Sequence, residues 1–201
     1  MSINVANIVA NTKTKANISK LTWGDIMKKL FSIFILSVIL LSLSSCTARR
    51  IKTTKEDKYE KYLSKVEYAT DFMPDTDACG NYSSLTATYQ HEDLFFFDVY
   101  TVGLFLSYNE SEYEAQKNQI FSNYEFFTSD DESLKSDCDA TIKNYNIQLV
   151  KGEYEYSTIK MGLLIGTDDT NHKICYLFYY DFDLDILDDL DTYIKNYFYL
   201  Q

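Results

Sequence analysis

An aspartate-rich run near the carboxyl end is the stretch whose residue types and spacing come closest to a metal site. The run DFDLDILDDLD places Asp181, Asp183 and Asp185 at alternate positions, as in a calcium loop built on carboxylate oxygens. Such a loop also needs a glycine at its sharp turn and a closing glutamate, and Ile186 and Thr192 stand at those positions. We therefore expect no metal, and we interpret the run as a strand end leading into a helix with an acidic first turn.

No catalytic motif is present in the chain. The sequence contains no GxSxG, HExxH, phosphate loop or glycine-rich nucleotide motif. Glu92 and Asp93 stand beside His91 and could act as acid and base. They fall in an expected hairpin turn, however, where polar residues need no catalytic reason. We expect a domain that performs no chemistry and holds no cofactor.

The run MKKLFSIFILSVILLSLSSC, from Met27, has the layout of a secretory signal: two lysines, an apolar run, then small residues. Its uncharged part, Leu30 to Ser45, is shorter than the roughly 20 residues that span a bilayer, which favours a cleaved signal. A permanent transmembrane helix is the alternative, with Arg49 and Arg50 as its stop signal.

The end of this run, Leu43-Ser44-Ser45-Cys46, resembles the lipobox of bacterial lipoproteins. The resemblance covers residues 27–46 only. It implies that the Cys46 thiol receives a diacylglyceryl group and that the lipoprotein signal peptidase cuts before it, with Leu43, Ser44 and Ser45 as the recognition residues. It also implies a lipid-anchored protein on the extracytoplasmic side of the cell membrane.

Four segments follow from this reading. Residues 1–26 are an extension or, if translation starts at Met27, a mis-assigned beginning; the codons of Gly24-Asp25-Ile26 can carry a GGAG ribosome-binding sequence. Residues 27–45 are the signal peptide, residues 46–65 a lipidated cysteine with a basic tether, and residues 66–201 an acidic domain.

Charge is divided unevenly along the chain. The stretch 47–65 has 7 basic and 3 acidic residues, whereas residues 66–201 have 7 basic and 26 acidic residues. The tether could lie on anionic head groups, at about 1 kcal/mol per basic residue. The acidic domain excludes nucleic acid as a partner, because phosphate binding needs the opposite charge.

Three cysteines follow Cys46, and none has CxxC spacing. Cys175 lies in an apolar run and is expected to be a buried thiol, so Cys79 and Cys138 are the only candidates for a disulfide.

All 18 tyrosines also follow Cys46. An exposed tyrosine row could stack on sugars or contact a protein, but strand spacing favours a role in the core.

Apolar periodicity predicts an α+β fold: a mostly antiparallel sheet of about five strands with helices on one face. The expected order is helix, two strands, helix, three strands, helix. The helices are expected at about 54–67, 109–124 and 185–199, and the strands at 85–90, 94–108, 141–152, 157–167 and 173–183.

The sequence thus predicts a surface lipoprotein whose domain binds a partner or ligand at the bacterial envelope without catalysis. The segments KVEYATDFMPD and YDFDLD are loosely similar to uncharacterised lipoproteins of Firmicutes, and this resemblance implies no activity. The alternative is an envelope hydrolase that acts on glycans with Asp or Glu carboxylates. The lipid on Cys46 makes the membrane one partner, and a protein or glycan partner is left open.

Overall fold

The computed structural model describes residues 23–43, 49–66, 68–94, 97–128, 138–152, 161–181, 189–198 and 200. The chain divides into two units, Met1–Ser45 and Cys46–Gln201. In the first unit, helix α2 spans Trp23–Leu43 and includes Lys28, Lys29 and most of the uncharged run that follows them. Among the described residues, no helix is both long enough and apolar enough to cross a membrane.

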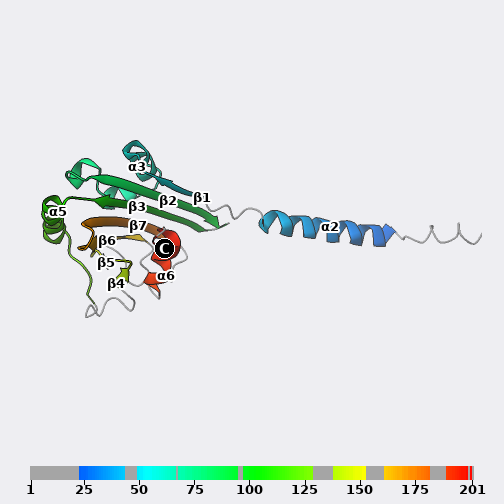
Figure 1. The fold of residues 1–201 in the computed structure, drawn as a ribbon. Coiled ribbons are helices and arrows are strands. Elements are labelled where there is room, and N and C mark those ends of the chain that lie inside the picture. Colours follow the sequence, from blue (N-terminus) through cyan, green and yellow to red (C-terminus); the bar gives the residue numbers. More distant parts are fainter. Residues whose placement is uncertain are drawn as a thin grey trace, which may run out of the picture. The chain divides into compact units, whose positions relative to one another are not determined.

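In the second unit, seven antiparallel strands form one sheet in the order β1-β2-β3-β7-β6-β5-β4 (Figure 1). The strands are β1 (Arg49–Thr53), β2 (Ser84–Leu94), β3 (Phe97–Ser107), β4 (Asp139–Ile142), β5 (Tyr145–Leu149), β6 (Met161–Asp168) and β7 (Lys173–Asp181). The helices are α3 (Glu56–Leu63), α4 (Ala69–Phe72), α5 (Glu110–Asn123) and α6 (Leu190–Tyr197), with a 3-10 turn η1 (Asp77–Cys79). The α+β class and the antiparallel sheet are confirmed.

The expected number of about five strands is wrong, and so is the expected order of elements. Strand β1 lies within the predicted tether and pairs with β2 along the sheet edge. The alternation of apolar residues predicts one strand at 141–152. The structure has two strands there, β4 and β5, because the chain reverses direction at Lys143–Asn144. Each of these three strands has at most five residues, too few for periodicity to separate it from its surroundings.

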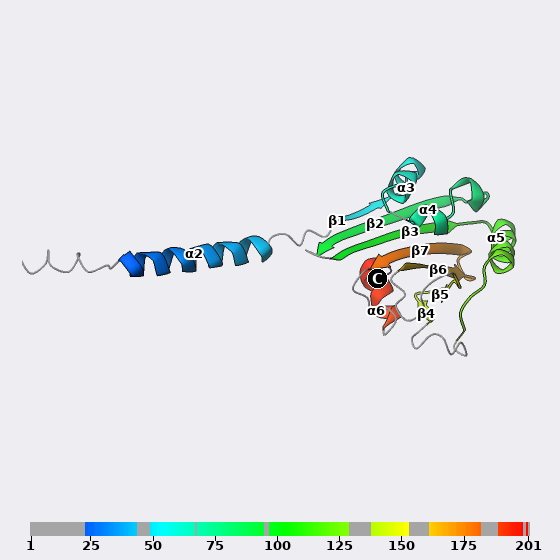
Figure 2. The same ribbon diagram turned by 180° about the vertical axis from the view of Figure 1, so that it is seen from behind.

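Helices cover both faces of the sheet, whereas the sequence predicts one covered face. Helices α3, α4 and α5 lie on one side of the sheet or at its end, and α6 lies on the other (Figures 1 and 2). Strand β7 shows the consequence: Tyr176 and Phe178 join one core cluster, and Leu177 and Tyr179 join the other. A strand buried on both faces is a continuous apolar run, as KICYLFYY is.

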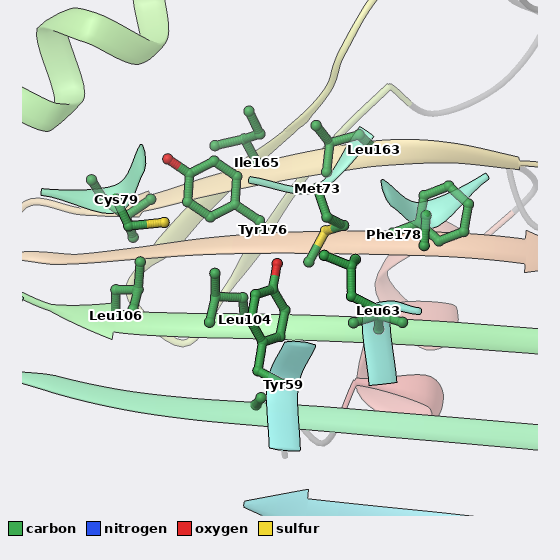
Figure 3. Packing of buried hydrophobic residues seen from close by; sticks show 14 of the residues in the cluster. Tyr59, Leu63, Met73, Cys79, Leu104, Leu106, Leu163, Ile165, Tyr176 and Phe178 are labelled. Atoms are coloured by element: carbon green, nitrogen blue, oxygen red, sulfur yellow. The ribbon is translucent and has the colours of Figure 1, made fainter. Parts of the chain in front are cut away.

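Many tyrosines serve as core residues, as the cluster that contains Tyr176 and Phe178 shows. Tyr59 of α3 packs among Leu63, Leu104 and Tyr176 (Figure 3). Its hydroxyl donates to the Pro74 carbonyl oxygen at 2.6 Å, so its one polar group is satisfied in the interior.

The last helix begins at Leu190 rather than at Asp185, which lies outside the described residues. Asp189 caps it by accepting a hydrogen bond from the Thr192 backbone N–H at 3.0 Å. Its apolar stripe, Leu190 and Ile194, joins the core cluster of Leu177 and Tyr179.

Helix α5 is capped by Asn109, whose side chain accepts a hydrogen bond from the Glu112 backbone N–H at 3.0 Å. The Glu112 carboxylate accepts a hydrogen bond from the Asn81 side-chain amide at 3.3 Å.

Candidate functional site

The residues that the sequence marks for lipidation and metal binding fall mostly outside the described part of the chain: Ser44, Ser45, Cys46, Asp183 and Asp185. Leu43 is the last residue of α2, and Asp181 is the last residue of β7 and is buried. Within the described ranges, no three or more His, Cys, Asp or Glu side chains gather as metal ligands would.

His91, Glu92 and Asp93 lie within strand β2 and not in a turn, so the expected turn position is wrong. His91 stacks on Tyr100 of β3, and its Nε2 lies 3.2 Å from an Asp98 carboxylate oxygen. Alternate residues point to opposite faces of a strand, so His91 and Glu92 cannot converge on one substrate.

The three cysteines that follow Cys46, namely Cys79, Cys138 and Cys175, are all buried. Cys79 belongs to the core cluster on one face of the sheet, whereas Cys138 and Cys175 belong to the cluster on the other. A disulfide between Cys79 and Cys138 is therefore absent. Burial raises the pKa of Cys79 to about 12, so this thiol is unreactive at neutral pH.

A cavity of about 240 Å³ lies on the sheet face that α6 covers, at the end of the sheet where β7 begins. Its lining residues come from segments far apart in the chain: Lys52, Thr86, Thr88, Phe105, Lys143, Tyr145, Lys173, Phe198 and Leu200. The strand register brings several of them together, because Lys52 pairs with Thr88, and Thr86 with Phe105. We refer to this cavity as the lysine pocket.

The three lysines distinguish the pocket from the rest of the acidic domain. Beyond residue 65 the structure describes five lysines, and three of them form ion pairs: Lys117 with Asp169, Lys151 with Glu125 and Lys195 with Asp191, at 2.5, 2.9 and 3.1 Å. The other two are Lys143 and Lys173. Together with Lys52 they line the pocket without an ion pair to any described residue. The cavity therefore concentrates positive charge that forms no ion pair with a carboxylate of the described residues.

Asp168 is the carboxylate on the strand position opposite Lys173. Its oxygens accept hydrogen bonds from the backbone N–H groups of Thr170 and Asn171 and from the Asn171 side chain, at 3.1, 3.0 and 2.8 Å. The turn between β6 and β7 thus occupies this carboxylate, and it does not pair with the lysine.

Two threonine hydroxyls complete the polar part of the pocket. Thr88 is only 3% exposed, and neither its hydroxyl nor that of Thr86 forms a hydrogen bond with any described residue. Gly103 makes room for Thr88, since a Cβ at Gly103 would lie 2.5 Å from the Thr88 Oγ1. The Thr88 hydroxyl is not one of the buried unsatisfied groups, so it is open to a ligand or to water in the pocket.

The remaining wall of the pocket is apolar and mostly aromatic. Phe105 and Tyr145 meet edge to face with ring centroids 6.4 Å apart, and Phe198 and Leu200 close the cavity from the segment after α6. Burial raises the pKa of Tyr145 above its usual value, so the phenol stays protonated at neutral pH. The pocket can therefore receive an anionic group at its lysines and an apolar group against its rings.

Sequence reasoning missed this site. Lys52 resembles the other basic residues of the expected tether, and Lys143 and Lys173 resemble ordinary turn lysines. One signal was available, because Thr86 and Thr88 occupy alternate positions and show that one face of β2 is not purely apolar.

A second, larger cavity of about 480 Å³ lies beside α3 and η1. It is lined by Glu56, Thr76, Asp77, Gly80, Asn81 and Tyr82. The Tyr82 hydroxyl donates to the Glu56 carboxylate, and burial together with this bond raises the pKa of Tyr82. Two carboxylates thus line one polar cavity.

Comparison of the chain with the families of known proteins, with curated proteins and with solved structures gave no match.

Proposed function

We propose that the protein is a lipid-anchored lipoprotein of the bacterial envelope whose domain binds a small anion in the lysine pocket without catalysing a reaction. The anchoring part rests on the lipobox resemblance and on the exposed apolar side chains of α2, among them Leu30, Phe31 and Phe34. The binding part rests on one observation: three lysines without ion pairs to described residues meet at one cavity of an acidic domain.

The charge of the whole domain does not oppose this proposal. The acidic surface repels anions at long range, but charges more than about 8 Å apart are largely screened at physiological ionic strength. Within the pocket, apolar walls lower the local dielectric constant and strengthen the attraction of the lysines. Local charge therefore decides binding once an anion arrives.

Calorimetric titration of the full chain in detergent tests the proposal. Acetate, inorganic phosphate, benzoate and phenyl phosphate are the probes. We expect at least one of them to bind, and we expect Lys52→Gln, Lys143→Gln and Lys173→Gln each to weaken that binding about twofold to fivefold, as for exposed ion pairs. Lys195→Gln removes the same charge outside the pocket and should leave binding unchanged. Absence of binding by all four anions, or equal loss in the Lys195 variant, would contradict the proposal.

The second candidate function is hydrolysis of an envelope glycan at the larger cavity. The observation that favours it is that Glu56 and Asp77 both line that cavity, because glycoside hydrolysis uses two carboxylates. The short bond from Tyr82 gives Glu56 a structural partner, which is why we place this function second.

Release of reducing sugar from purified cell-wall glycan tests this second candidate. A true hydrolase would lose activity in Glu56→Gln and Asp77→Asn and keep it in Glu114→Gln. No release by the unmodified protein would exclude this candidate.

A further inference from the structure

We infer that the ligand of the lysine pocket is an amphipathic organic anion: one carboxylate or phosphate joined to a flat apolar body of about the size of a benzene ring. This inference rests on the proposed function and adds the chemical class of the ligand. It follows from the mixed charged and apolar lining of the pocket, from its volume and from Thr88.

The lining combines charged, hydroxyl and apolar side chains. Lysines and threonines lie next to aromatic rings, because Thr86 pairs with Phe105 and Lys143 lies two residues before Tyr145. An inorganic anion would satisfy the lysines and leave the rings in contact with water. An organic anion covers both the charged and the apolar side chains, and a flat body suits walls made of aromatic rings.

The volume limits the apolar body. A cavity of about 240 Å³ is smaller than the roughly 300–1,000 Å³ of drug-sized pockets. The acyl chains of a membrane lipid do not fit this space, so the ligand is a small soluble molecule.

Thr88 adds a position for the anionic group. Thr88 pairs with Lys52 in the strand register, its Oγ1 lies against Gly103 of β3, and its hydroxyl has no hydrogen-bond partner among the described residues. A carboxylate or phosphate oxygen held by the lysines would accept from this hydroxyl. Thr88 is thus expected to orient the ligand, while the lysines supply the attraction.

Affinities of matched probes for the full chain in detergent test the inference. Benzoate or phenyl phosphate should bind at least about tenfold more tightly than acetate or inorganic phosphate, since each apolar group buried adds free energy. Benzyl alcohol, which has the ring without the charge, should bind at least about tenfold more weakly than benzoate. The carboxylate and phosphate probes show which anionic group the site prefers.

Two variants assign the binding to the pocket. Thr88→Val keeps the shape and removes the hydroxyl, so it should leave the folded state intact and weaken benzoate binding. Thr141→Val, an exposed position on β4 outside the pocket, is the matched control and should leave binding unchanged.

Equal affinity for acetate and benzoate would overturn the inference and leave the proposed anion site standing. Equal affinity for benzoate and benzyl alcohol would overturn both, because the lysines would then contribute nothing.

Discussion

Lys143 has a backbone conformation that lysine rarely adopts. Its φ is +55°, in the left-handed region, at the tight turn between β4 and β5. Such a conformation costs roughly 1–2 kcal/mol for a residue with a Cβ, and strained residues of this kind cluster at functional sites. Lys143 is also one of the three lysines that line the pocket, so a change at this position can affect both the turn and the proposed anion site.

Lys143→Gly should therefore separate stability from binding. Glycine adopts this φ freely but loses more entropy on folding, so we expect the free energy of unfolding to rise by about 0.5–1 kcal/mol. Anion affinity should fall in the same variant. Asn144→Gly, in the same turn at a residue without positive φ, should lower stability instead. Urea unfolding of the three proteins measures the effect, and a less stable Lys143→Gly variant would contradict it.

A second residue-scale prediction concerns Asp169 in the turn between β6 and β7. Hydrogen bonds from Lys117 and Tyr113 lower the pKa of Asp169. A carboxyl with a lowered folded pKa stabilises the fold above its unfolded pKa near 4, and this contribution is lost as pH falls through the folded pKa. Because Asp169 is more than half exposed, the contribution is less than about 1 kcal/mol.

Urea unfolding at pH 7 and pH 2 tests this sign. Asp169→Asn should be less stable than the unmodified protein at pH 7 and equally stable at pH 2. Asp71→Asn, at an exposed carboxylate of α4, should show no such difference at either pH. A loss that persists at pH 2 would show that the aspartate acts through packing rather than charge.

At the scale of elements, the sequence predicts the strands that are long enough to repeat their apolar alternation several times. Strands β2, β3, β6 and β7 have eight or more residues each and were predicted near their observed positions. Strand β1 is short and carries three basic residues, so its charge suggests a tether, although a basic edge strand also protects a sheet from aggregation. The pocket lysines could not be predicted, because Lys52, Lys143 and Lys173 come from segments far apart in the chain that line one cavity only in the folded sheet.

Helix α6 gives the clearest prediction at this scale. Leu190 and Ile194 are fully buried against the sheet, so truncation of either to alanine should cost about 2–5 kcal/mol. Asp191 pairs with Lys195 one turn later on a half-exposed surface, so Asp191→Ala should cost only about 0.3–0.5 kcal/mol. Denaturant unfolding compares the three variants. Equal destabilisation at apolar and acidic positions would mean that α6 does not cover this face.

At the scale of the whole molecule, the chain combines a proposed lipid anchor with an acidic domain that we propose to bind an anion. The basic residues next to Cys46 are expected to favour an anionic membrane surface, and the 26 acidic residues beyond residue 65 are expected to keep the domain away from it. Such an arrangement would leave the lysine pocket accessible to soluble ligands.

The anchor itself is tested at Cys46. Cys46→Ala should abolish incorporation of labelled palmitate, and the protein should be released from the membrane or stay unprocessed. Cys138→Ala removes another thiol and should leave labelling unchanged. Undiminished labelling in Cys46→Ala would exclude the lipobox interpretation.

The central claim, that the lysine pocket binds a small organic anion, is tested most directly by amide NMR spectra of the full chain during titration with benzoate. We expect the largest saturable shifts at Thr88, Gly103 and Lys173, which lie in or beside the pocket, and little change at Gly80 beside the larger cavity. The Lys52→Gln, Lys143→Gln, Lys173→Gln triple variant should lose these shifts while its spectrum stays folded. Shifts centred on Gly80, or no saturable shifts at any amide, would contradict the account.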